Sequence, residues 1–198
     1  MADILVIGYG NEVRGDDGIG PRVAEAIAAV NYPGVRVVRC FQLVPELAAD
    51  LADAQLAVFV DALANPRRRD IEMRRITAEE MSDWSTHTGD PRALLALTWA
   101  VYGRTPEAWW VMVPGEDFGF GEGLSPLAEE NVREAIDRIA VLVARSSWMG
   151  KSGTAFFTVI TAPLDLWDID HSRSGHPALF EHDSREMPDP SISPNFSR

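Results

Sequence analysis

The chain has 198 residues, a formal net charge of −12 at pH 7 and hydrophobic residues at 46% of its positions. This length and composition indicate one soluble globular domain with a sizeable core. An acidic chain repels phosphate groups, so nucleic-acid binding and membrane-surface binding are both disfavoured. The single cysteine, Cys40, excludes an internal disulfide and a cysteine-rich metal site. No apolar run reaches the roughly 18 residues of a membrane-spanning helix, and we therefore expect a cytoplasmic protein.

The N-terminal part of the chain alternates predicted strands with predicted helices. Residues 4–7 are a short apolar run that predicts a buried strand. Apolar side chains then recur every three or four residues, which predicts a helix that begins near residue 17. Residues 35–40 predict a second strand, and residues 45–53 a short helix. The apolar positions of the first helix are Ile19, Val23, Ile27 and Val30.

The same alternation continues through the middle of the chain. The next elements are predicted as a strand at 56–62 and an edge strand at 71–77. A helix at 90–103, a strand at 108–115 and a helix at 125–144 follow. Ser125 is placed to cap the last of these helices. Apolar strands that alternate with helices predict a three-layer α/β sandwich with a largely parallel sheet. We assign this domain to residues 1–146.

The last part of the chain, residues 147–198, has a different character. It is rich in proline and serine and holds three of the four histidines of the chain. One apolar stretch, residues 154–160, is compatible with a further strand. The remainder predicts a largely disordered C-terminal tail.

The segment GYGNEVRGDDGIG at residues 8–20 has the look of a dinucleotide-binding loop. That fingerprint needs a third glycine where this chain has Val13. Asp16 and Asp17 stand where the pyrophosphate would lie, and their carboxylates would repel it. We therefore predict no nucleotide cofactor. A single aspartate here would be an ordinary helix cap, and we assign Asp16 to helix capping or to support of its neighbour.

Asp17, Asp61 and His87 are candidates for one shared site. Asp17 follows the first predicted strand, Asp61 closes the apolar run of the third, and His87 precedes a helix. Ligands of open α/β sheets bind beyond the carboxyl ends of the strands, where these residues are expected to converge. Two carboxylates and an imidazole suit nickel, zinc or non-haem iron, or the positioning of a water. The alternatives are a strand-end turn residue for Asp61 and a surface histidine for His87.

Four segments in this order resemble the hydrogenase maturation proteases, over roughly residues 3–145. They are ILVIGYGNEVRGDDGIGPRVAEAI, VFVDA, THTGDPRALLAL and VPGEDFGFGEGLSP. The matching positions of the first segment include Gly8, Gly10, Asn11, Asp16, Asp17 and Gly20. The loop after the second strand, CFQLVPEL, resembles only one branch of that family, and it is expected to touch the substrate.

The resemblance implies a twisted, five-stranded sheet flanked by helices. It also implies an endopeptidase that removes a C-terminal peptide from the precursor of a nickel–iron hydrogenase large subunit. Asp17, Asp61 and His87 would then bind nickel, which the precursor itself carries, and the protein is expected to act as a monomer. One alternative is a non-catalytic nickel-binding or docking protein on the same fold. Another is a dinucleotide-binding oxidoreductase.

Overall fold

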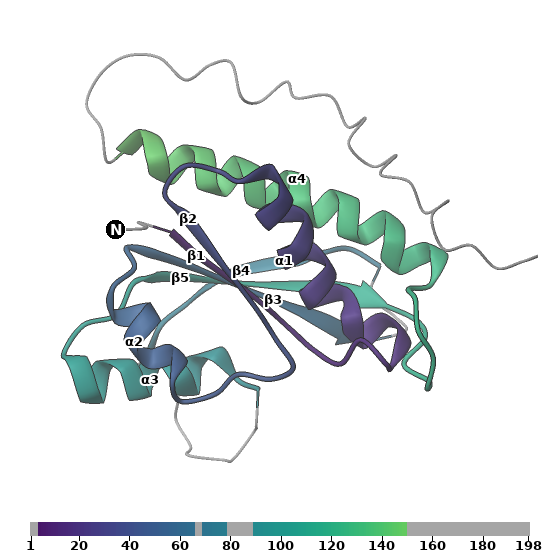
Figure 1. Ribbon diagram of the computed structural model, residues 1–198, viewed down its shortest axis with the longest axis horizontal. Helices are drawn as coiled ribbons and strands as arrows, with labels where there is room; N and C mark the ends of the chain where they lie inside the picture. The colour runs from purple at the N-terminus through teal and green to yellow at the C-terminus, as the bar shows by residue number, and fades with distance from the viewer. Residues whose placement is uncertain (1–3, 66–68, 79–88, 150–198) are drawn as a thin grey trace, which may run out of the picture. The chain divides into compact units, whose positions relative to one another are not determined.

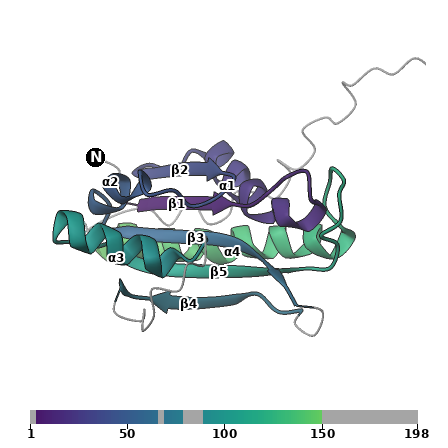
Figure 2. The same cartoon turned by 90° about the horizontal axis from the view of Figure 1, so that it is seen from below.

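The computed structural model describes residues 4–65, 69–78 and 89–149, and these form an α/β sandwich around a five-stranded sheet (Figure 1). The strands lie in the order β2-β1-β3-β5-β4, as Figure 2 shows. Four of them run parallel, and β4 pairs antiparallel with β5 at one edge. The strands are β1 (Ile4–Tyr9), β2 (Val35–Cys40), β3 (Leu56–Ala64), β4 (Glu72–Ile76) and β5 (Glu107–Gly115).

Helices cover both faces of the sheet. α1 and α4 pack on one face, and α2 and α3 pack on the other. A short 3₁₀ helix, η1, leads into α1. The helices are η1 (Gly15–Gly18), α1 (Ile19–Val30), α2 (Leu47–Ala52), α3 (Pro91–Tyr102) and α4 (Pro126–Met149). Among the described residues, no helix is long and apolar enough to cross a membrane.

The two faces of the sheet follow from the period of two along each strand. In β1, Ile4 and Val6 enter the core under α1 and α4. Leu5 and Ile7 enter the core under α2 and α3. All four are almost fully buried, because helices cover the sheet on both sides. This explains why the strand reads as a continuous apolar run.

The order of the strands creates a crevice at the carboxyl ends of β1 and β3. From β1 the chain passes through α1 to β2 on one side. From β2 it passes through α2 to β3, on the other side of β1. The connections therefore diverge between β1 and β3, and ligands of open α/β sheets bind at such a switch point.

The structure confirms the predicted fold class and the predicted order of strands and helices. The edge position of β4 is also confirmed. Val30 is 41% exposed, so the buried apolar stripe of α1 is shorter than the spacing predicts. Val30 is the last residue of α1, because the next residue, Asn31, takes the left-handed conformation that ends the helix. α4 includes residues 147–149, which the sequence assigned to the tail. The rest of that predicted tail, with the strand expected at 154–160, lies outside the described residues.

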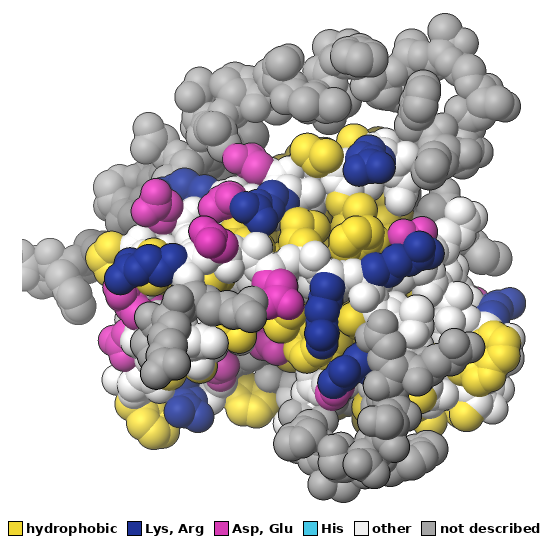
Figure 3. Space-filling model, turned by 180° about the vertical axis from the view of Figure 1, so that it is seen from behind, with side chains coloured by type: hydrophobic (Ala, Val, Ile, Leu, Met, Phe, Trp, Pro, Cys, Tyr) yellow, Lys and Arg dark blue, Asp and Glu magenta, His cyan; other side chains and the backbone are white. Residues whose placement is uncertain are grey.

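The surface carries both signs of charge despite the net charge of −12. Figure 3 shows acidic and basic side chains interspersed on one face, with hydrophobic side chains between them. Paired charges such as Arg138 with Glu134 and Arg133 with Glu129 lie along α4. The excess of acidic residues is therefore not a uniform negative field over that face.

Glycine brings α1 into contact with the sheet. A Cβ atom on Gly20 would lie 2.3 Å from the carbonyl oxygen of Tyr9 and 2.6 Å from that of Val60. A Cβ atom on Gly8 would lie 2.0 Å from the carbonyl oxygen of Gly20. These neighbours are backbone atoms and cannot rotate away. The start of α1 therefore rests directly on the end of β1 and the middle of β3.

We predict that Gly20→Ala lowers the free energy of unfolding by about 3 kcal/mol, because the added methyl group would push α1 off the sheet. Gly121→Ala is the matched control, since a Cβ atom there meets nothing within 4 Å. Urea unfolding of both variants measures the difference. Equal stability of Gly20→Ala and the wild type would contradict the close contact.

Candidate functional site

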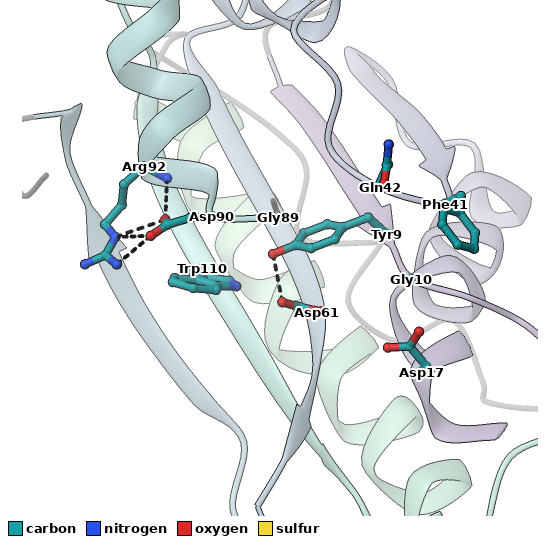
Figure 4. A pocket seen from close by; sticks show the side chains of 10 residues that line it. All are labelled: Tyr9, Gly10, Asp17, Phe41, Gln42, Asp61, Gly89, Asp90, Arg92 and Trp110. Atoms are coloured by element: carbon teal, nitrogen blue, oxygen red, sulfur yellow. Dashed lines mark hydrogen bonds and ion pairs between the residues drawn. The ribbon is translucent and has the colours of Figure 1, made fainter. Parts of the chain in front are cut away.

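A cavity of about 460 Å³ opens at the switch point between β1 and β3 (Figure 4). It is lined from β1, β3, β5, the loop after β2 and the start of α3. Asp17 and Asp61 both line it, so the structure brings these two predicted site residues together. The other lining residues are Tyr9, Gly10, Phe41, Gln42, Gly89, Asp90, Arg92 and Trp110.

Asp61 lies within β3, three residues before its last residue, Ala64, and pairs with Met112 of β5. It is therefore not a turn residue at the end of a strand. Its Oδ2 accepts a hydrogen bond of 2.9 Å from the hydroxyl of Tyr9. Burial raises the pKa of Asp61 to about 6, and the negative charge of Asp17 adds to the increase. The Tyr9 hydrogen bond acts in the opposite direction.

Asp17 lies in η1, and its carboxylate does not cap α1. Its Oδ2 accepts a hydrogen bond of 3.0 Å from the backbone N–H of Asn11. The side chain of Asn11 in turn accepts one of 3.1 Å from the N–H of Val13. Figure 4 shows the Asp17 carboxylate directed towards Asp61. The loop between β1 and α1 therefore presents a carboxylate to the pocket.

Asp16 points the other way and is fully buried. Its Oδ2 accepts hydrogen bonds from the N–H groups of Glu116 and Asp117 and from the hydroxyl of Ser125. Its Oδ1 accepts a fourth from the N–H of Ser125. Of the two roles predicted for Asp16, capping of the helix that follows it is wrong, because its side chain makes no hydrogen bond to the start of that helix. Support of its neighbour Asp17 stays a prediction. The carboxylate of Asp16 instead ties the β1–α1 loop to the β5–α4 loop.

His87 lies outside the described residues, as do the other three histidines of the chain. The structure therefore does not test its predicted place beside the two aspartates. Gly89 and Asp90, which follow it closely in the sequence, line the cavity. Within residues 4–65, 69–78 and 89–149, no group of three or more His, Cys, Asp and Glu side chains is arranged to hold a metal ion.

The wall of the cavity opposite Asp17 is formed by residues that were not predicted from the sequence. Trp110 of β5 lies there, with Arg74 at 4.9 Å and Arg92 at 5.9 Å from its ring centre. Arg92 donates four hydrogen bonds to the carboxylate of Asp90, one of 2.9 Å from its backbone N–H and three from its guanidinium, of which the shortest is 2.6 Å from Nη2. These residues gather only through strand pairing and the position of α3, so no local sequence signal marks them.

Tyr9 was also missed, and it contacts both Asp61 and the aromatic wall. It is 4% exposed, and burial and the charge of Asp61 raise its pKa. The hydroxyl therefore stays protonated and remains a donor. The buried Nε1–H of Trp110 is directed towards the hydroxyl of Tyr9 and acts to lower the pKa of Tyr9. The two atoms are not within hydrogen-bonding geometry.

Comparison with solved structures finds the same fold in several hydrogenase maturation proteases. HycI of Thermococcus kodakarensis, a NiFe hydrogenase maturation protease, superposes with a TM-score of 0.60 and 24% identity, over 72% of this chain and 93% of its own. The hydrogenase maturating endopeptidase HybD of E. coli superposes with a TM-score of 0.59 and 21% identity, over 72% of this chain and 93% of its own. A hydrogenase 2 maturation peptidase from a Thaumarchaeota archaeon has a TM-score of 0.56 and 21% identity, over 71% of this chain and 97% of its own.

The chain has the fold of the hydrogenase maturation proteases. This confirms the fold that the sequence resemblance implies. No protein-family model and no curated protein matches the chain by sequence. The matched structures are covered over more than nine-tenths of their own length, so this chain contains almost all of their fold.

We predict that Asp61→Asn stabilises the protein at pH 7.5 by about 1–3 kcal/mol. The pKa of Asp61 is about 6 in the folded protein, against the ordinary aspartate value of 3.8 that applies to the unfolded chain. The wild type therefore loses stability as the pH rises from 3.8 to about 6, and the uncharged variant does not. The two proteins should converge near pH 3.5. Urea unfolding between pH 3.5 and pH 7.5 measures the difference in stability. If Asp61→Asn were less stable than the wild type at pH 7.5, the charge of Asp61 would not be unfavourable in the folded protein.

We predict that Asp16→Asn destabilises the protein by about 2–4 kcal/mol at pH 7. Both carboxylate oxygens of Asp16 accept hydrogen bonds, and the variant replaces one of them with an NH₂ group, which is a donor and would face another donor. Burial acts to raise the pKa of Asp16, but the donated hydrogen bonds hold it below 3.8. Its contribution is therefore present above pH 3.8 and is lost as the pH falls further, where the difference should shrink. Asp70→Asn, at an exposed carboxylate outside this network, is the control and should change little.

Proposed function

We propose that the chain is an endopeptidase that removes a C-terminal peptide from the nickel-loaded precursor of a nickel–iron hydrogenase large subunit. Three kinds of support agree. The sequence motifs resemble the hydrogenase maturation proteases, the fold is theirs, and Asp17 and Asp61 both line a cavity at the switch point of the sheet. The shared cavity of Asp17 and Asp61 carries the proposal.

The electrostatics of this cavity favour a cationic ligand. Asp17 and Asp61 raise each other's energy when both are ionised, which is why the charge of Asp17 contributes to the raised pKa of Asp61. The basic side chain in the cavity lining, Arg92, forms an ion pair with Asp90. A divalent cation would relieve the repulsion between Asp17 and Asp61. A pyrophosphate would increase it, so the dinucleotide alternative is disfavoured.

In the proposed reaction the nickel is part of the substrate. Asp17, Asp61 and His87 would complete the coordination of nickel held by the precursor, with ligands of the oxygen and nitrogen type that suit it. This contact would hold the scissile peptide bond beside a carboxylate that orients the hydrolytic water. The hydrogen bond from Tyr9 holds the Oδ2 atom of Asp61 in place in the wall of the cavity.

The test is the cleavage of a large-subunit precursor from the same source, with and without nickel, followed by mass spectrometry. We expect a C-terminal peptide to be released from the nickel-loaded precursor. Asp17→Asn and His87→Ala should each slow this release by about 100-fold or more. Asp53→Asn is a matched control, because Asp53 is an exposed aspartate far from the cavity, paired with Arg104.

Two results would contradict the proposal. Nickel-dependent binding of the precursor without cleavage would favour the non-catalytic docking protein. Cleavage by Asp17→Asn at the rate of the wild type would remove the proposed site, even if the activity itself were confirmed.

A further inference from the structure

Three loops lie side by side at the carboxyl edge of the sheet. The central loop runs from Gly10 to η1 and carries Asp17. On one side, the N–H of Gly10 donates a 3.2 Å hydrogen bond to the carbonyl of Cys40, next to the loop after β2. On the other side, Gly121 donates to Val13 at 3.1 Å and accepts from Gly15 at 3.0 Å.

Each of these loops exposes a large apolar side chain. Phe41 on the first loop is 64% exposed, Val13 on the central loop 50%, and Phe120 on the third loop 93%. The other large apolar side chains that are exposed in the described part of the chain lie on helices. They are Val30, Trp99, Val101, Tyr102 and Val141.

The loop that carries Phe120 is held firmly in place. Its neighbours Glu116 and Asp117 donate their backbone N–H groups to the buried carboxylate of Asp16. Gly119 donates to the side chain of Asp117 at 2.9 Å, and Gly121 pairs with the central loop. An apolar side chain on a preorganised loop loses little conformational entropy when a partner covers it. Such side chains are typical anchors of protein interfaces.

We infer that Phe41, Val13 and Phe120 form a docking surface for the folded body of the precursor, which begins with Phe41 in the lining of the cavity and extends away from it across the central loop. The inference rests on the proposed function. Phe41 lines the cavity, whereas Phe120 lies on the far side of the central loop, so a partner that contacts both must extend across all three loops. A folded protein does this, and a short peptide in the cavity does not.

Charged residues surround these apolar side chains. Glu12 and Arg14 flank Val13, and Asp117 and Glu122 lie on either side of Phe120 along the chain, all of them exposed. Apolar anchors within a polar, solvated rim are the usual anatomy of an interface between folded proteins that also exist apart. The surface thus fits a transient protein partner.

The inference is tested with the full chain and the nickel-loaded precursor. Phe120→Ser and Val13→Ser should each weaken binding of the precursor and raise its KM by roughly tenfold, with kcat little changed, because neither residue lines the cavity. Trp99→Ser is the matched control, because Trp99 is 59% exposed on α3, away from the three loops. Circular dichroism should show that the variants keep the unfolding midpoint of the wild type.

The outcomes separate the two proposals. If the wild type cleaves the precursor and Phe120→Ser does so with the same KM, the docking surface is wrong and the proposed function stands. If the wild type neither binds nor cleaves the precursor, the proposed function fails and the inference fails with it. If sedimentation shows a dimer of the free protein that Phe120→Ser dissociates, the surface serves self-association and the inference is overturned.

Discussion

The buried carboxylate of Asp16 holds the functional edge of this molecule together. It accepts four hydrogen bonds from Glu116, Asp117 and Ser125, which lie about a hundred residues further along the chain. A buried carboxylate is costly unless donors surround it, and here both oxygens are satisfied. Because Asp16 is anchored, the loop that precedes α1 has a fixed path. Asp17 therefore has a fixed position, and so does the β5–α4 loop with Phe120. The geometry of the candidate site thus depends on a residue that does not line it.

The neighbouring acids show how the environment assigns different roles to the same side chain. Asp16 is surrounded by donors, which keep its pKa below the ordinary value. Asp61 has Tyr9 as its donor and a second carboxylate beside it, and burial raises its pKa to about 6. The first arrangement stabilises the folded protein at neutral pH, and the second costs stability there. A site that keeps an unfavourable pair of charges in a cavity is arranged for a ligand that compensates them. The proposed nickel centre of the precursor is such a ligand.

Much of the fold is predictable because its signals are local. Apolar runs and helical spacings place the strands and helices within a few residues, and the order of elements gives the parallel sheet. The pairing of Tyr9 with Asp61 is different, because it depends on the register between β1 and β3. Two successive aspartates also look identical in the sequence. Only the turn of η1 sends Asp16 into the interior and Asp17 into the cavity. The exposure of Val30 likewise depends on where α1 ends, which spacing alone does not fix.

The central claim is that Asp17 and Asp61 bind nickel carried by the precursor. X-ray absorption at the nickel edge tests it most directly, on the loaded precursor alone and on its complex with this protein, frozen before cleavage. We expect additional oxygen or nitrogen ligands on nickel in the complex, and their loss with the double variant Asp17→Asn, Asp61→Asn. Identical nickel coordination in the free precursor and in the complex would contradict it.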